Sequence, residues 1–192
     1  MSNKTEIRFA GSGGQGLILA GIILADAAAI YDNKNAVQTQ SYGPEARGGS
    51  SKSEVVISDE PIEYPKATKI DYMVALTQES FSKYICDLRD NGVVIADKEL
   101  IADFSNAKGK LYMLDMVKSA REELGNLLGL NIVALGALVE ISNVVSKEAI
   151  LKALLKRVPK GFEDYNKKAL EIGFRLAKEV KNTIHVESRN ND

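Results

Sequence analysis

The sequence predicts an α/β fold: a single domain whose mostly parallel sheet is flanked by helices and whose C-terminal part is helical. Two observations predict it. Short apolar segments alternate with helical patterns between residues 6 and 116, as in the β-α-β units that build parallel sheets. From Asn131 onward, three long helical patterns follow one another without a strand pattern between them. The expected architecture is Rossmann-like.

The expected strands are short, apolar and bounded by polar or glycine-rich turns. They cover residues 6–10, 36–40, 54–58, 71–76, 92–97 and 110–116. The expected helices cover residues 17–31, which are apolar on nearly all sides, and then 78–90, 131–143, 146–158 and 161–182. Ser146 has the place and residue type of a helix N-cap. A polar tail from about residue 185 is expected to fray, and residues 1–192 are expected to form one domain.

Composition excludes several classes of function. The 25 Lys and Arg residues nearly balance the 26 Asp and Glu residues, so no nucleic-acid partner is expected. The apolar stretch 17–30 is too short to span a bilayer and contains Asp26, so no membrane partner is expected and the chain is predicted to be cytoplasmic. One Cys and one His cannot build an iron–sulfur or zinc site alone, and the single thiol, Cys86, is predicted to be buried.

A glycine motif separates the first strand from the first helix. Gly11, Gly13 and Gly16 match G-x-G-x-x-G, a turn that lets backbone N–H groups approach a phosphate at a helix N-terminus. A dinucleotide site also needs an acidic residue at the end of the second strand, which here ends in Thr-Gln-Ser, and neither Asp26 nor Asp32 is suitably placed. Two interpretations stay open: tight strand–helix packing, or close approach of a docked group or partner chain.

A second glycine-rich segment, "QSYGPEARGGSSKS", follows the second strand. It carries Tyr42, Glu45 and Arg47 between Gly43 and the Gly48–Gly49 pair, and arginine has a planar fork that suits a carboxylate or a phosphate. A solvated surface loop would explain the same residues equally well on spacing alone. Because ligands of doubly wound sheets bind at the carboxyl ends of strands, we expect both glycine turns at the same edge of the sheet.

Together, "GSGGQG" and "QTQSYGPEARGGSSKSEVVISDEPIEYP" resemble the gamma subunits of the 2-oxoacid:ferredoxin oxidoreductases. The pattern is most similar to the stand-alone gamma subunit of the 2-oxoglutarate enzyme. The segments "NIVALGAL", "SKEAILKALLKRV" and "YNKKALEIGF" are similar to this family as well, so the resemblance extends from about Glu6 to Val180.

The resemblance implies a complex that oxidatively decarboxylates a 2-oxoacid to an acyl-CoA and reduces ferredoxin. It implies thiamine diphosphate between alpha and beta subunits, iron–sulfur clusters, and CoA; it allows a ferredoxin-like delta subunit. This chain alone is expected to bind no cofactor and to have no catalytic or metal-ligating residue. The resemblance assigns CoA-side contacts to Gly11, Ser12, Gly13, Gln15, Gly16, Tyr42, Gly43, Glu45, Arg47 and Gly49.

Two alternatives remain at this point. Both glycine turns could contact the alpha or beta subunit in place of CoA. The chain could also be an independent oxidoreductase domain that binds NAD or a flavin at the first glycine turn, although the missing acidic residue counts against this.

Overall fold

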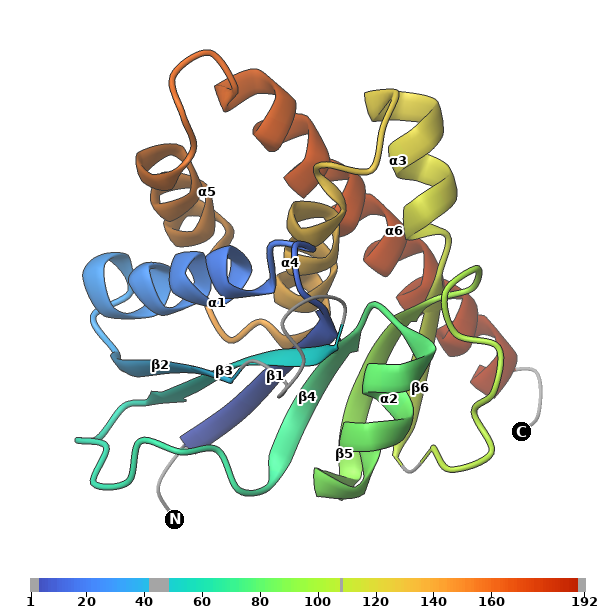
Figure 1. Cartoon of the computed structure of the whole chain (residues 1–192), viewed down its shortest axis with the longest axis horizontal. Helices are drawn as coiled ribbons and strands as arrows, with labels where there is room; N and C mark the ends of the chain where they lie inside the picture. Colours follow the sequence, from blue (N-terminus) through green and yellow to red (C-terminus); the bar gives the residue numbers. More distant parts are fainter. Residues whose placement is uncertain (1–3, 42–48, 108, 190–192) are drawn as a thin grey trace.

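The computed structural model describes residues 4–41, 49–107 and 109–189, with side chains as far as residue 182. A single six-stranded sheet forms the centre, and Figure 1 shows most of the helices stacked above it. Within the described residues, no helix combines the length and the apolar character that crossing a membrane requires.

The strands are β1 Lys4–Ser12, β2 Asn35–Ser41, β3 Ser50–Ser58, β4 Ile70–Ala75, β5 Leu88–Asp97 and β6 Lys110–Leu114. Their order across the sheet is β2-β3-β1-β4-β5-β6. The neighbours β1, β4, β5 and β6 are parallel, whereas β3 runs antiparallel to both β1 and β2. The predicted α/β fold with a mostly parallel sheet is confirmed, with one reversed strand that was not predicted.

The reversal of β3 follows from the length of its connection to β2. Parallel strands need a crossover of a dozen or more residues, while antiparallel neighbours can be joined by a short loop. β2 ends at Ser41 and β3 begins at Ser50, which leaves no room for a crossover helix. The second glycine-rich segment therefore connects two adjacent antiparallel strands.

The helices are α1 Leu17–Asp26, α2 Gln78–Tyr84, α3 Met116–Leu124, α4 Leu130–Ser142, α5 Lys147–Arg157 and α6 Glu163–Arg189. A π-helical turn, η1 (Ala27–Tyr31), continues α1 to the predicted end at residue 31, and a 3-10 turn, η2 (Ile85–Asp87), follows α2. The predicted cap is confirmed, because the Ser146 hydroxyl accepts a hydrogen bond from the Ala149 N–H at 3.1 Å.

Several predicted boundaries are wrong, and one of them is the start of β3, which lies at Ser50 and not at residue 54. The helix predicted for 78–90 ends early because Leu88 pairs with Ile70 of β4 and buries its side chain. The strand predicted for 110–116 ends at residue 114, and the unpredicted α3 begins where the buried Asp97 carboxylate accepts the Val117 N–H at 2.7 Å. The last helix starts at Glu163 and continues to residue 189, past the predicted end at 182 and into the polar tail.

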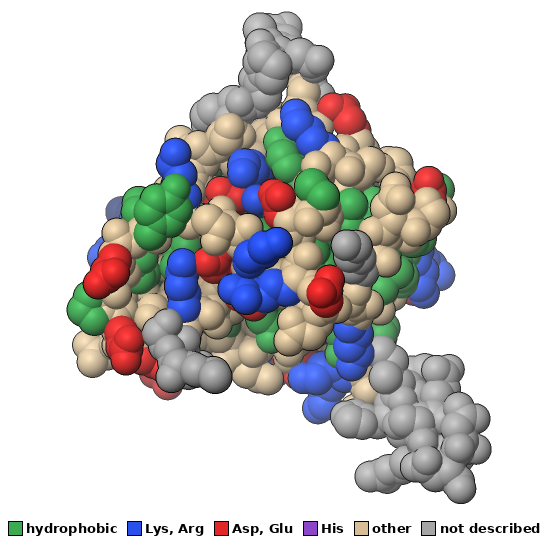
Figure 2. Space-filling model, turned by 90° about the horizontal axis from the view of Figure 1, so that it is seen from below, with side chains coloured by type: hydrophobic (Ala, Val, Ile, Leu, Met, Phe, Trp, Pro, Cys, Tyr) green, Lys and Arg blue, Asp and Glu red, His purple; other side chains and the backbone are tan. Residues whose placement is uncertain are grey.

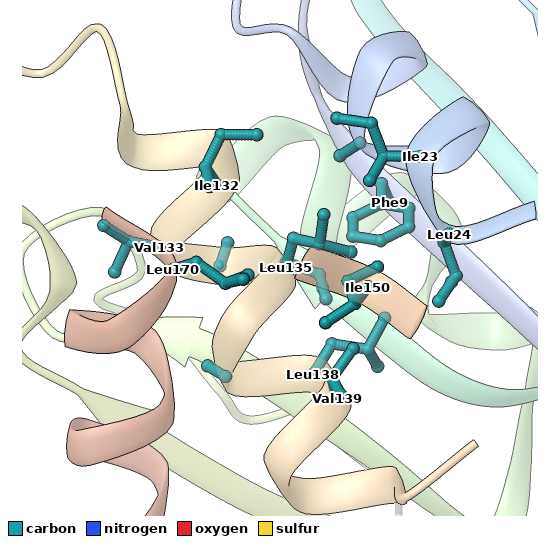
Figure 3. Packing of buried hydrophobic residues seen from close by; sticks show 14 of the residues in the cluster. Phe9, Ile23, Leu24, Ile132, Val133, Leu135, Leu138, Val139, Ile150 and Leu170 are labelled. Atoms are coloured by element: carbon teal, nitrogen blue, oxygen red, sulfur yellow. The ribbon is translucent and has the colours of Figure 1, made fainter. Parts of the chain in front are cut away.

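Strand residues alternate between two separate cores. The larger core lies between the sheet and α1, α3, α4, α5 and α6, and Figure 3 shows side chains from five elements meeting there: Phe9, Ile23, Leu24, Leu135, Leu138, Ile150 and Leu170. The smaller core lies on the opposite face, under α2, and includes Ala10, Met73, Phe81, Ile85, Val94 and Ile101. Helix α4 is buried along most of its length, which explains its lack of a polar face.

Helices α4 and α6 pack against each other at two glycines. A Cβ atom at Gly173 would lie 2.0 Å from the Val133 carbonyl oxygen, and one at Gly136 would lie 2.3 Å from the Leu170 carbonyl oxygen. Both distances are far inside van der Waals contact, so only glycine permits this backbone approach. The close crossing lies in the middle of α4, whose N-terminal end contacts the first glycine turn through Asn131.

Candidate functional site

The first glycine turn is shorter than predicted. Gly11 and Ser12 belong to the end of β1, and the turn itself spans residues 13–16 before α1 begins at Leu17. Gly14 and Gly16 have φ angles of 90° and 73°, in the left-handed region that side-chain-bearing residues rarely adopt. The chain therefore needs glycine at these two positions for its own backbone geometry.

The side chain of Gln15 fills the inside of this turn. Its Oε1 accepts a hydrogen bond from the Ser12 N–H at 2.8 Å, and its Nε2 donates to the Leu76 carbonyl at the end of β4 at 3.3 Å. A Cβ at Gly11 would lie 2.3 Å from the same Oε1. The absence of a side chain at Gly11 thus makes room for Gln15, which ties the turn to the neighbouring strand.

Asn131, near the start of α4, holds the other end of the turn. Its Nδ2 donates to the Gly16 carbonyl at 3.1 Å, and a Cβ at Gly16 would lie 2.4 Å from that nitrogen. Asn131 is 6% exposed, so this hydrogen bond is shielded from water. Contacts within the chain therefore explain why two of the three motif residues, Gly11 and Gly16, are glycines.

Gly13 differs from the other motif glycines. No described residue has an atom within 4 Å of a Cβ built on it, and its φ is not in the left-handed region. It opens into a hollow of about 300 Å³ at the junction of β1, α1 and β3, lined among others by Ser12, Ser51 and Lys52. Helix α1 has no side-chain N-cap, so the positive end of its dipole is not satisfied by a cap there.

The first glycine turn lies at the edge of the sheet where the second glycine-rich segment rejoins it at Gly49 and Ser50. Ser12 at the end of β1 pairs directly with Ser50 at the start of β3, and Gly49, which is buried, immediately precedes it. The Ser50 hydroxyl donates to Glu79 of α2 at 2.6 Å, and the Tyr84 hydroxyl donates to the Ser50 carbonyl at 3.2 Å. Helix α2 therefore anchors the point where the second turn re-enters the sheet.

A largely buried ion-pair network lies next to this contact between α2 and β3. Arg8, 1% exposed, donates from Nε to Glu54 at 2.8 Å and from Nη1 to Asp87 at 2.6 Å. The guanidinium and the Lys52 ammonium lie 5.2 and 5.5 Å from the centre of the Tyr84 ring. Figure 2, a view from below, shows Lys and Arg side chains beside Asp and Glu side chains near the middle of this face.

The charge of Asp87 is stabilised within the network. Burial by itself raises the pKa of this carboxyl, but the hydrogen bond and positive charge of Arg8 outweigh it, and the pKa lies below its ordinary value. Removing one carboxylate would leave the buried Arg8 guanidinium incompletely paired and would destabilise the fold. The network therefore stabilises β1 and β3 where they meet α2.

The predicted site residues divide into two groups. Gly11, Ser12, Gly13, Gln15, Gly16 and Gly49 are described and lie together at one edge of the sheet. Tyr42, Gly43, Glu45 and Arg47 lie outside the described residues. Sequence patterns missed the residues that position the turns: Asn131, Glu79 and Tyr84 are far away in the chain, and no local motif marks them.

Both acidic residues considered for a dinucleotide site have structural partners elsewhere. Asp26 forms an ion pair with Arg157 of α5 at 2.6 Å. Asp32 accepts hydrogen bonds from the N–H and the hydroxyl of Ser146 at 2.6 and 2.7 Å, at the start of α5. Both carboxylates are thus engaged on the α5 side of the domain, which is consistent with the argument against a ribose-binding acid at these positions.

The structure also tests the prediction for the single thiol, Cys86. The prediction that Cys86 is buried is wrong: it is exposed, because the helix expected around it gives way to the 3-10 turn η2. In the part of the chain that the structure describes, no group of three or more His, Cys, Asp or Glu side chains could hold a metal ion.

Comparisons with known proteins identify related sequences and structures. The family model described as pyruvate ferredoxin/flavodoxin oxidoreductase matches residues 6–176. The 2-oxoglutarate synthase subunit KorC of Methanocaldococcus jannaschii is 51% identical over 92% of this chain and 96% of its own length. The crystal structure of a keto/oxoacid ferredoxin oxidoreductase gamma subunit from Geobacter sulfurreducens PCA has a TM-score of 0.86 and 48% identity, over 93% of this chain and 98% of that chain.

A more distant relative shows the same region inside a longer polypeptide. The ketoisovalerate oxidoreductase subunit VorA of Methanothermobacter thermautotrophicus is 31% identical over 92% of this chain, which corresponds to 37% of that subunit. The chain therefore belongs to the pyruvate ferredoxin/flavodoxin oxidoreductase family, as a gamma-type subunit of the 2-oxoacid:ferredoxin oxidoreductases.

Proposed function

We propose that this chain is the gamma subunit of a 2-oxoglutarate:ferredoxin oxidoreductase, which oxidatively decarboxylates 2-oxoglutarate to an acyl-CoA and reduces ferredoxin. The observation that carries the proposal is the 51% identity to a 2-oxoglutarate synthase subunit over almost the full length of both chains. In this proposal the alpha and beta subunits, with or without a ferredoxin-like delta subunit, hold thiamine diphosphate and the iron–sulfur clusters. The gamma subunit supplies docking surface and CoA contacts, and it is inactive alone.

The residues of this chain support that division of labour. A cubane cluster normally requires about four thiolates, and the sequence contains one Cys. A single thiol also fits a reducing compartment, which supports a cytoplasmic complex. The redox groups therefore belong to other subunits.

We assign the CoA contacts to the hollow beside Gly13. CoA carries a pyrophosphate and a ribose phosphate, and helix N-termini and basic side chains bind such groups. The uncapped start of α1 supplies N–H donors, and Gly13 leaves the backbone accessible, whereas the ammonium of Lys52 at the rim of the hollow is paired with Glu54 at 2.9 Å. In this proposal the cation is Arg47, in the segment outside the described residues.

A Gly13→Val variant tests this assignment in the reconstituted enzyme. No described residue has an atom within 4 Å of a Cβ at this position, so the unfolding temperature of the isolated subunit should change little. If CoA approaches the turn, the apparent KM for CoA should rise several-fold while kcat at saturating CoA changes little. Arg47→Ala should raise the same KM.

Two other results would change the proposal. Unchanged CoA kinetics together with weaker association of Gly13→Val with the other subunits would reassign the turn to the subunit interface. Isolation of the native chain as a colourless, NAD-binding protein, without larger subunits or brown iron–sulfur absorbance, would favour the independent nucleotide-binding domain.

A further inference from the structure

An apolar groove continues from the first glycine turn toward the segment between α3 and α4. We propose that this groove, lined by Leu19, Asn126, Leu127, Leu128, Asn166 and Phe162, receives an uncharged, apolar segment of the larger subunits of the oxidoreductase. The inference rests on the proposed function, and it names the surface of this chain through which the complex is held together. It also separates the docking surface from the hollow assigned to CoA.

The groove consists of two adjoining hollows. The first, of about 550 Å³, extends from Gly14 and Leu19 to the segment between α3 and α4. The second, of about 300 Å³, extends from that segment to Phe162. Both are lined by Asn126, Leu128 and Asn166, so they form one continuous depression.

Exposed apolar side chains are concentrated at this groove. Leu128 is 83% exposed, Phe162 54%, Leu127 41% and Leu19 36%. These are four of the seven large hydrophobic side chains that are exposed among the described residues. Contiguous apolar surface of this kind marks interaction sites on soluble proteins, whereas single exposed residues do not.

None of the described residues that line the two hollows is charged, although charged residues make up 27% of the sequence. The cores of protein interfaces are depleted in charge and enriched in aromatic and apolar residues, while phosphate-binding sites need cations. The lining therefore complements an uncharged protein surface and does not suit the phosphates of CoA.

Leu128 is held outward by a rigid turn. Asn126 Oδ1 accepts hydrogen bonds from the Leu128 N–H at 2.9 Å and from the Tyr165 hydroxyl at 2.6 Å. The same hydroxyl accepts the Gly129 N–H at 3.0 Å. Because the backbone on both sides of Leu128 is held by hydrogen bonds, this turn loses little backbone conformational freedom when a partner covers the groove, which favours binding.

The relative VorA supports a larger subunit as the occupant over a second copy of this chain. The region homologous to this chain makes up 37% of that polypeptide, so in that protein the same kind of domain is covalently joined to a larger remainder. In a complex of separate subunits, as proposed for this chain from its match to 96% of a KorC subunit, the same association is non-covalent and needs a complementary surface that is exposed in the isolated subunit.

Leu128→Asp and Ile30→Asp form a matched pair of variants. Both replace an exposed apolar residue by a charge, since Ile30 is 52% exposed in η1, at the other end of the α1–η1 helix from the glycine turn. Each isolated variant should unfold at the wild-type temperature. Binding to co-expressed alpha and beta subunits, measured by titration, should weaken about tenfold or more for Leu128→Asp and should not change for Ile30→Asp.

The alternatives give different results. If wild-type and Leu128→Asp bind equally well, the groove is not the docking surface, while the proposed function stands. If the wild-type chain does not bind the larger subunits, the proposed function fails and the inference fails with it. If Leu128→Asp abolishes self-association of the isolated chain and leaves subunit binding intact, the occupant is a second copy and the inference is overturned.

Discussion

The contact between Gly16 and Asn131 predicts a specific energetic coupling. In Gly16→Ala the new Cβ would lie 2.4 Å from Asn131 Nδ2, in a backbone conformation with a φ of 73°. The substitution therefore has two separate costs. One is the strain of an L-residue in the left-handed region, and the other is the displacement of the Asn131 amide from its hydrogen bond with the Gly16 carbonyl.

The two costs can be estimated separately. Left-handed backbone costs an L-residue roughly 1–2 kcal/mol. Displacing a buried amide from its only acceptor costs roughly 1–2 kcal/mol more. Gly16→Ala should therefore lower the free energy of unfolding by about 2–4 kcal/mol in the wild-type background. In an Asn131→Ala background only the backbone strain remains, and the same change should cost about 1–2 kcal/mol.

A double-mutant cycle of Gly16→Ala and Asn131→Ala measures this difference. Urea unfolding followed by circular dichroism gives the four free energies, and the double variant should be more stable than the sum of the single effects predicts by about 1–2 kcal/mol. Gly13→Ala is the control, and it should change stability by less than about 0.5 kcal/mol. Additive effects within about 0.3 kcal/mol would show that Asn131 does not hold the turn, and the reasoning would be refuted.

Two further predictions concern stability. Gly173→Ala should destabilise the chain by about 2–3 kcal/mol, because its Cβ would lie 2.0 Å from the Val133 carbonyl oxygen and a helix backbone cannot move aside. A melting temperature equal to or above that of the wild type would contradict this. Burial raises the pKa of Glu6, but the hydrogen bond and charge of Lys4 and the N–H donors of Lys69 and Thr68 outweigh burial, so the pKa lies below its ordinary value. The stabilisation by ionised Glu6 is therefore lost as the pH falls through that pKa. Glu6→Gln should therefore be clearly less stable than wild type at about pH 7 and closer to it at about pH 3 in urea unfolding, and an equal gap at both pH values would rule out ionised Glu6 as the cause.

Local patterns predicted most of the secondary structure. The helix that begins at Leu17 was recognised because it is apolar on nearly all sides, and the structure buries it against β1, β3 and α5. Ser146 was recognised as a cap because a serine before a helical pattern accepts backbone N–H groups that have no other partner. Each of these signals lies within a few residues of the feature that it predicts.

Features that depend on distant residues could not be predicted in this way. Leu88 looks like the end of an amphipathic helix, and only its pairing with Ile70 makes it the start of β5. The start of α3 depends on the carboxylate of Asp97, 20 residues earlier in the chain. Likewise, Asn131 shapes the glycine turn across 115 residues of sequence, and nothing near Asn131 indicates this role.

The three motif glycines are alike in the sequence, but they have different physical reasons in the structure. Gly11 makes room for Gln15, and Gly16 satisfies a left-handed backbone beside Asn131, so both would be required even in a chain that bound nothing. Among the described residues Gly13 has no such reason, and the strand–turn–helix geometry alone would tolerate a side chain there. We therefore expect the functional role of the motif at Gly13, where a substitution should have little effect on stability and a several-fold effect on the apparent KM for CoA or on assembly.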